Sequence, residues 1–103
     1  MAESERGDAV SKPKVTETDI RRQVRDYLQL RQYFCFYVLQ GLGAYKGIPD
    51  LIAVRDGRVI FIELKTARGR QSDYQKKFQA DLEAAGGEYV LCRGIEDLQE
   101  RGI

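Results

Sequence analysis

The chain has no histidine, and only two cysteines and two prolines occur among its 103 residues. Without histidine, the usual cysteine–histidine zinc sites and any Ser-His or Cys-His nucleophile are excluded. Cys35 and Cys92 are far apart, form no CxxC motif and lie in apolar runs, so we expect two reduced core residues rather than a disulfide.

Long hydrophobic runs and an excess of one charge are also missing. No apolar stretch approaches transmembrane length, and the N-terminal residues lack the apolar core of a signal peptide, so we expect a soluble cytoplasmic protein. The chain carries 17 Lys and Arg against 16 Asp and Glu, a formal net charge of +1. This balance gives no general polycation signal, so DNA binding would need local basic clusters beside an acidic site.

The length of 103 residues predicts one compact domain. Residues 1–14 are polar and of mixed charge, which predicts a flexible N-terminal tail. Residues 15–103 are the expected folded domain.

Helical periodicity occurs in two main segments. Thr16 and Asp19 predict the capped start of a first helix, in which Ile20, Val24 and Leu28 share an apolar face. Ser72 predicts the cap of a second helix that ends before Gly86-Gly87. The expected buried stripe of the second helix is Tyr74, Phe78, Leu82 and Ala85. A short last helix is expected from Ile95 to about Arg101.

Four segments rich in β-branched and aromatic residues predict strands: 33–39, 51–55, 58–65 and 88–92. Asp56-Gly57 between the second and third is a hairpin signal. Both faces of this hairpin are apolar, so we expect it to be central and covered on both sides. The order is α-β-β-β-α-β-α, an α/β (α+β) domain with a central mixed sheet flanked by helices.

The hairpin also predicts a site. A two-residue turn at Asp56-Gly57 places Asp50 directly opposite Glu63, on the same face of the sheet. Lys65 lies two residues beyond Glu63 and therefore also on that face. Two carboxylates and one ammonium group thus converge at one end of the hairpin.

Two carboxylates opposed across strands repel each other, and a divalent cation between them removes the conflict. Mg²⁺ prefers oxygen ligands and is commonly bound by one or two protein carboxylates together with substrate phosphates. The Leu64 carbonyl, between Glu63 and Lys65, is a further candidate ligand. The lysine can orient or deprotonate an attacking water and offset charge in the transition state.

Pro49-Asp50 followed by Glu63-Leu64-Lys65 resembles the PD-(D/E)XK nuclease signature. More closely, residues 47–51, residues 61–66, Gln71-Ser72 with Gln75, and Gly87 before the last strand resemble the VRR-Nuc domain. The resemblance implies a restriction-endonuclease-like αβββαβ core, dependence on Mg²⁺ or Mn²⁺, and phosphodiester hydrolysis. It assigns metal binding to Asp50 and Glu63, and catalysis to Lys65.

The same resemblance adds two candidate residues. An acidic residue on the first helix often completes such sites, and Glu17 is the best match, with Asp19 as its competitor. Gln75 matches the helix glutamine that supports the site; the alternative is a solvated helix residue.

Stand-alone members of this family resemble junction-resolving enzymes, which implies branched DNA as substrate, a Holliday junction in particular, and a homodimer. A flap or restriction-type nuclease and a non-catalytic DNA-binding module remain the alternatives. Arg21, Arg22 and Arg25 lie on the polar side of the first helix and could also contact phosphate. The main candidates for phosphate contact are Lys46, Arg68, Arg70, Lys76 and Lys77.

Overall fold

The computed structural model describes residues 15–103, and the expected tail at 1–14 lies outside the described residues. The elements follow in the order α2 (Glu17–Leu30), β1 (Phe34–Tyr37), β2 (Leu51–Arg55), β3 (Arg58–Leu64), α3 (Asp73–Ala84), β4 (Glu88–Cys92) and α4 (Ile95–Gln99). Both long helices start as expected: Thr16 and Ser72 are N-caps, each in a complete capping box. Within the described residues, no helix is long and apolar enough to cross a membrane.

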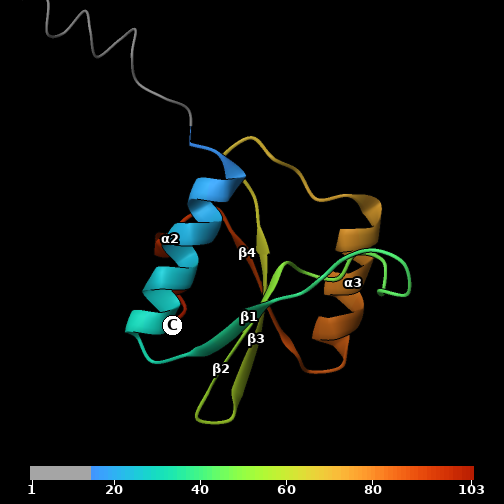
Figure 1. Cartoon of the computed structure of the whole chain (residues 1–103). Helices are drawn as coiled ribbons and strands as arrows, with labels where there is room; N and C mark the ends of the chain where they lie inside the picture. Colours follow the sequence, from blue (N-terminus) through green and yellow to red (C-terminus); the bar gives the residue numbers. More distant parts are fainter. Residues whose placement is uncertain (1–14) are drawn as a thin grey trace, which may run out of the picture.

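The four strands form one mixed sheet in the order β1-β2-β3-β4. The first two pairings are antiparallel, whereas β3 and β4 are parallel, with α3 as the connection between them. Figure 1 shows α2 on one side of the sheet and α3 on the other. The predicted α+β architecture with a central mixed sheet is confirmed.

The main core lies between α2 and the sheet. The three predicted helix residues, Ile20, Val24 and Leu28, are all buried against alternate residues of β2 and β3. The C-terminal segment closes this side, because the Tyr27 hydroxyl donates to the Ile103 carbonyl at 2.7 Å. The amphipathic period of the first helix therefore identified the correct face.

The β2–β3 hairpin has the predicted register. Arg55 pairs with Arg58, and Leu51 pairs with Ile62. Extending this register by one step places Asp50 opposite Glu63, and the Leu64 amide donates to Asp50 Oδ2 at 2.8 Å across the same strands. The hairpin thus brings Asp50 to the end of β3.

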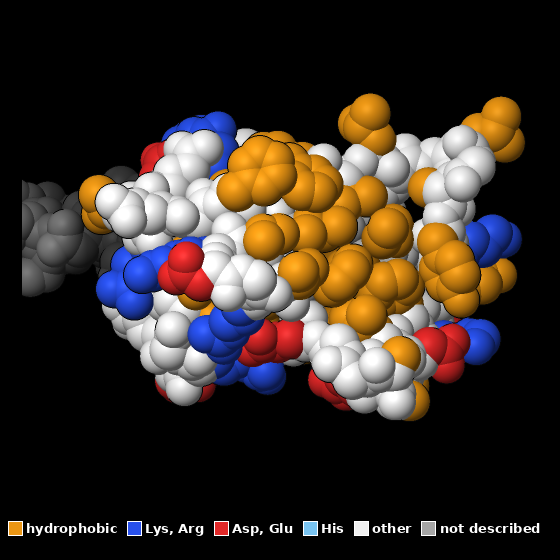
Figure 2. Space-filling model, turned by 90° about the horizontal axis from the view of Figure 1, so that it is seen from below, with side chains coloured by type: hydrophobic (Ala, Val, Ile, Leu, Met, Phe, Trp, Pro, Cys, Tyr) orange, Lys and Arg blue, Asp and Glu red, His pale blue; other side chains and the backbone are white. Residues whose placement is uncertain are grey.

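The expectation that the hairpin is covered on both faces is wrong. Phe34 on β1 is 68% exposed and Val59 on β3 is 43% exposed, both on the α3 side of the sheet. Seen from below, hydrophobic side chains form one continuous area across the middle of the molecule, with charged side chains at its margins (Figure 2). The apolar pattern indicated a face that packs, but within residues 15–103 α3 is the one helix on this side of the sheet.

The predicted buried stripe of α3 is wrong for the same reason. Within α3 no residue is fully buried. Phe78 and Leu82 are half-buried and Tyr74 and Ala85 are exposed. The helix contacts the sheet through aromatic pairs, since Phe78 stacks against Phe61 and Tyr89 with ring centroids 5.9 and 6.4 Å apart. Three further elements are shorter than expected: β1 spans Phe34–Tyr37, β3 ends at Leu64, and α4 ends at Gln99.

The loop between β1 and β2 rests on the start of α3 at Gly47. A Cβ atom added there would lie 2.2 Å from the Tyr74 carbonyl oxygen, and the residue has φ +84°. Gly43, in the same loop, has a similar φ of +88° but no atom within 4 Å of such a Cβ. Only Gly47 needs both the left-handed backbone and the missing side chain.

This pair gives a matched test. Gly43→Ala pays only the left-handed backbone strain, about 1–2 kcal/mol. Gly47→Ala adds the displacement of the α3 backbone, on the order of 1–3 kcal/mol more. Chemical denaturation of both variants should therefore show the larger loss for Gly47→Ala. Equal losses would contradict the close contact between this loop and α3.

Candidate active site

The carboxylate of Asp50 lies at the entrance to β2, fixed from two sides. Its Oδ2 accepts the Leu64 amide at 2.8 Å, and its Oδ1 lies 3.9 Å from Arg21 Nη2 on α2. The side chain is 12% exposed. One oxygen is therefore committed to the backbone of β3, and the other has only a distant charge partner.

The carboxylate of Glu63 lies beside it on the α3 face of β3, and the residue is only 1% exposed. Its Oε2 accepts from Gln75 Nε2 at 2.9 Å and lies 3.7 Å from Lys65 Nζ. Its Oε1 is buried and has no hydrogen-bond partner among the described residues. A buried acceptor without a donor is energetically costly.

Burial, and after it the negative charge of Asp50, raise the pKa of Glu63 from its ordinary value to about 8. A proton on Glu63 can be donated to Asp50, which also favours the neutral form, whereas the Lys65 ammonium opposes it. Glu17 adds a smaller upward contribution. The raised pKa means that Glu63 favours its protonated form near neutral pH in the metal-free protein.

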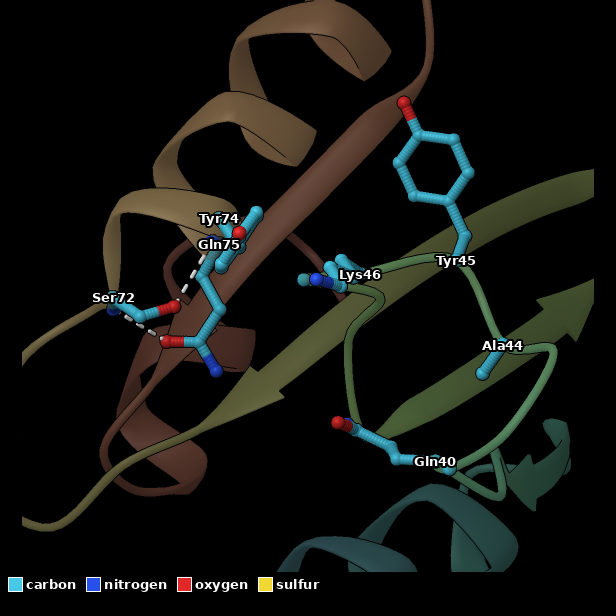
Figure 3. Close-up of a pocket in the computed structure, with 9 residues that line it drawn as sticks. Gln40, Ala44, Tyr45, Lys46, Ser72, Tyr74 and Gln75 are labelled. Carbon is cyan, nitrogen blue, oxygen red and sulfur yellow. Dashed lines mark hydrogen bonds between the residues drawn. The ribbon is translucent and has the colours of Figure 1, made fainter.

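Gln75 joins the start of α3 to this pair. Its Oε1 accepts from the Ser72 amide at 2.8 Å as the second half of the capping box, while its Nε2 donates to Glu63. Figure 3 shows the capping contacts of Ser72 and Gln75 facing the loop that carries Tyr45 and Lys46, across a pocket of about 340 Å³. The capping box thus orients the side-chain amide of Gln75 toward the carboxylate of Glu63.

The first-helix acids do not join the carboxylate pair directly. Glu17 lies 3.8 Å from Arg21 Nη2, and Asp19 is occupied by the Thr16 cap. Within residues 15–103, no three acidic, cysteine or histidine side chains form a group that could hold a metal ion. Arg21, expected only on the polar side of its helix, instead lies between Glu17 and Asp50.

The candidate phosphate-contacting residues differ in whether their charges already have partners. Lys46 Nζ lies 4.9 Å from the centre of the Tyr74 ring, and Lys77 forms an ion pair with Asp81 at 2.8 Å. Lys76, Arg68 and Arg70 are exposed and form no ion pair within the described part of the chain. A residue that the sequence did not single out, Arg93, holds the loop that carries Arg68 and Arg70.

The donor set fits a hard divalent cation. Among residues 15–103, Glu63 Oε1 has no donor and Asp50 Oδ1 has only Arg21 at 3.9 Å; the Glu63 carboxyl is buried, and the adjacent Asp50 carboxyl is 12% exposed. Carboxylate oxygens are the ligands that Mg²⁺ takes in proteins, and one or two of them suffice when substrate phosphate and water complete the sphere.

A mixed sheet between helices carries two carboxylates and a lysine at the end of its central hairpin, which is the arrangement expected from the resemblance to nuclease domains. The model of the VRR-NUC domain matches residues 23–96, and the chain belongs to this family of nuclease domains. A solved structure described as a VRR_NUC domain superposes with a TM-score of 0.71 at 15% identity, covering 82% of this chain and 90% of the other. Curated protein sequences gave no match.

The raised pKa of Glu63 predicts a pH dependence of stability in metal-free protein. Folding favours the protonated form, so this contribution to the free energy of unfolding is complete below pH 4.5 and is lost as the pH rises through about 8. The loss is about 1.4 kcal/mol per unit of pKa difference. Glu63→Gln should flatten the decline, as measured by denaturation in EDTA between pH 5 and about 9. An unchanged decline in Glu63→Gln would contradict the assignment.

Proposed function

We propose that this protein is a metal-dependent endonuclease that hydrolyses phosphodiester bonds in branched DNA. The observation that carries the proposal is the buried, incompletely satisfied carboxylate pair Asp50–Glu63 with Lys65 Nζ 3.7 Å from Glu63. A structural ion pair would not need two adjacent buried acids. Membership of a nuclease-domain family agrees with it.

Asp50, Glu63 and the Leu64 carbonyl would hold Mg²⁺ or Mn²⁺. When bound, such an ion supplies Lewis-acid polarisation of a phosphoryl oxygen. Lys65 projects from the same face as Glu63, where its ammonium orients the attacking water and offsets the charge that develops on the phosphate oxygens. Gln75 fixes the rotamer of Glu63 through its amide hydrogen bond. Glu17 acts at a distance, through Arg21.

The basic residues supply affinity for the phosphate backbone rather than base recognition. Lys46 Nζ lies 4.9 Å from the centre of the Tyr74 ring, and Lys76 is two residues after Tyr74 in α3. Arg68 and Arg70 lie in the loop that follows Lys65. Lys77 shares its charge with Asp81 and contributes less. Recognition of DNA shape, such as that of a four-way junction, needs no base-reading element.

Cleavage assays test this proposal. The protein is incubated with Mg²⁺ or Mn²⁺ and labelled four-way, flap and linear DNA. We expect symmetric paired nicks in the four-way junction, with loss of at least about 100-fold in rate for Lys65→Ala and Asp50→Asn. Asp56→Asn, at the exposed turn of the same hairpin, is the matched control and should cleave normally.

The outcomes separate the alternatives. Equal cutting of linear duplex would indicate a restriction-type enzyme, and preferred cutting of flaps a flap nuclease. Absence of cleavage on every substrate with either metal, while DNA is still bound, would leave a non-catalytic DNA-binding module. Lys65→Ala should retain DNA binding.

A second copy of the chain is the proposed occupant of the uncovered apolar face. The sheet contributes Phe34, Phe36 and Val59, and the next loop contributes Leu39, Leu42 and Tyr45. From their exposed fractions these six side chains present on the order of 700 Å², near the roughly 800 Å² per partner of a standard interface. DNA interfaces are polar and positively charged, so DNA does not fit this face.

The alternation of β2 also relates this face to the active centre. Ile52 and Val54 project from one side of β2, and the same alternation extended by one residue beyond the strand puts Asp50 on that side. A twofold partner would therefore lie beside the catalytic groups and bring two active centres to one branched substrate.

Sedimentation equilibrium tests the dimer. The wild-type protein should have twice the 11.8 kDa chain mass, and Phe34→Ser with Phe36→Ser should give monomers. Leu30→Ser is the matched control, because Leu30 is 83% exposed at the end of α2, outside the sheet. A monomeric wild-type protein, or equal disruption by Leu30→Ser, would contradict the assignment.

A further inference from the structure

We propose that the loop at residues 66–70 and Arg93 form a site for one backbone phosphate of the nucleic acid, and that Arg93 is the residue that positions this loop. The inference rests on the proposed function only for the identity of the ligand as a phosphodiester. It assigns a role to Arg93, which lies on the segment between β4 and α4.

The side chain of Arg93 binds the backbone carbonyl groups of the loop. Its Nη1 donates to the carbonyl oxygens of Thr66, Ala67 and Gly69, with the Gly69 contact at 2.8 Å. The loop is also turned on itself, since the Gly69 amide donates to the Thr66 carbonyl at 3.1 Å. One guanidinium nitrogen therefore fixes the course of the segment.

Three positively charged arginine side chains lie around this loop. A cavity of about 540 Å³ is lined by Ala67, Arg68, Gly69, Arg70 and Arg93. None of its three arginines forms an ion pair with a carboxylate within residues 15–103. The Nε and Nη2 atoms of Arg93 make no hydrogen bond to the described residues, so they remain available as donors.

Three guanidinium groups around one cavity repel each other unless an anion lies among them. Arginine binds phosphate through two parallel N–H donors, and its charge persists at every physiological pH. Among the described residues these three guanidinium groups have no carboxylate partner, and Nη1 of Arg93 holds the loop that carries the other two, so the cavity is suited to a phosphate. A carboxylate would also complement this charge, but the nucleic-acid substrate of a nuclease offers phosphates in a continuous row.

The loop is directly coupled to the catalytic lysine. The Lys65 amide donates to the Cys92 carbonyl at 3.0 Å, so Lys65 and Arg93 leave the sheet side by side. A Cβ atom at Gly69 would lie 3.3 Å from Lys65 Cδ, which shows how closely the loop packs on that side chain. A phosphate held by the loop is therefore a neighbour of the scissile phosphate, and it sets the register of the strand at the site.

The salt dependence of DNA binding tests this assignment without requiring cleavage. Binding of a labelled four-way junction is measured by fluorescence anisotropy in EDTA over a series of salt concentrations. Each phosphate contact contributes about 0.9 to the slope of log K against log salt concentration. Arg70→Ala, whose side chain makes no contact that folding requires, should lower the slope by about one such contact.

Arg93→Ala should lower the slope by more than one contact, because it removes its own donors and releases the loop. The double variant Arg70→Ala/Arg93→Ala should lose less than the sum of the single variants, as expected for residues that act through one loop. Arg101→Ala is the matched control. Its backbone carbonyl accepts from Arg58 at the opposite end of β3, and its slope should equal that of the wild type.

The outcomes are distinguishable from those of the cleavage assay. Wild-type slopes in both Arg70→Ala and Arg93→Ala would overturn the phosphate site, even if the protein cleaves DNA. Additive losses would overturn the positioning role of Arg93. Reduced slopes in a protein that cleaves nothing would retain the phosphate site and overturn the nuclease. Failure of the wild-type protein to bind DNA would overturn both.

Discussion

The unsatisfied carboxyl group of Glu63 is the constraint on which the rest of the site depends. It is 1% exposed, it lies beside Asp50, and one of its oxygens has no donor among the described residues. In isolation this arrangement lowers stability, because burial and like charge both oppose ionisation. This cost is the reason for proposing that a cation binds at that point.

The surrounding contacts orient the two acids without neutralising them. The Leu64 amide takes one oxygen of Asp50, and the Gln75 amide takes one oxygen of Glu63. In each case a neutral donor fixes the side chain and leaves the other oxygen available. Arg21 and Lys65 stand farther away, at 3.9 and 3.7 Å. The result is a pair of oriented carboxyl groups, each with one oxygen free of a close hydrogen bond from the described residues, as the proposed cation site requires.

Much of this centre could be predicted from the sequence, because its geometry is local. The Asp56-Gly57 turn determines the register of the hairpin, and the register places Asp50 opposite Glu63. The Ser72 cap is equally local, and it puts Gln75 in the first turn of α3. Wherever a residue's position follows from a turn or a cap, the pattern of residue types was sufficient.

What the sequence could not supply depends on contacts between distant segments. The role of Arg93 arises because β4 ends beside β3, and a lone arginine after a strand carries no signal of the carbonyls it will meet. Arg21 was expected to be solvated, since helix periodicity cannot show that Asp50 lies opposite it. The open apolar face was missed because hydrophobic pattern shows which side packs, whereas the number of covering helices is a property of the whole fold.

The binding of Mn²⁺ followed by isothermal titration calorimetry, with wild-type protein and Asp50→Asn, tests the central claim most directly. We expect binding by the wild-type protein with release of protons near pH 7, because a bound cation would displace the proton that the raised pKa keeps on Glu63. Asp50→Asn should bind at least about 10-fold more weakly. Equal Mn²⁺ affinity in both proteins, or no binding by the wild type, would contradict the account.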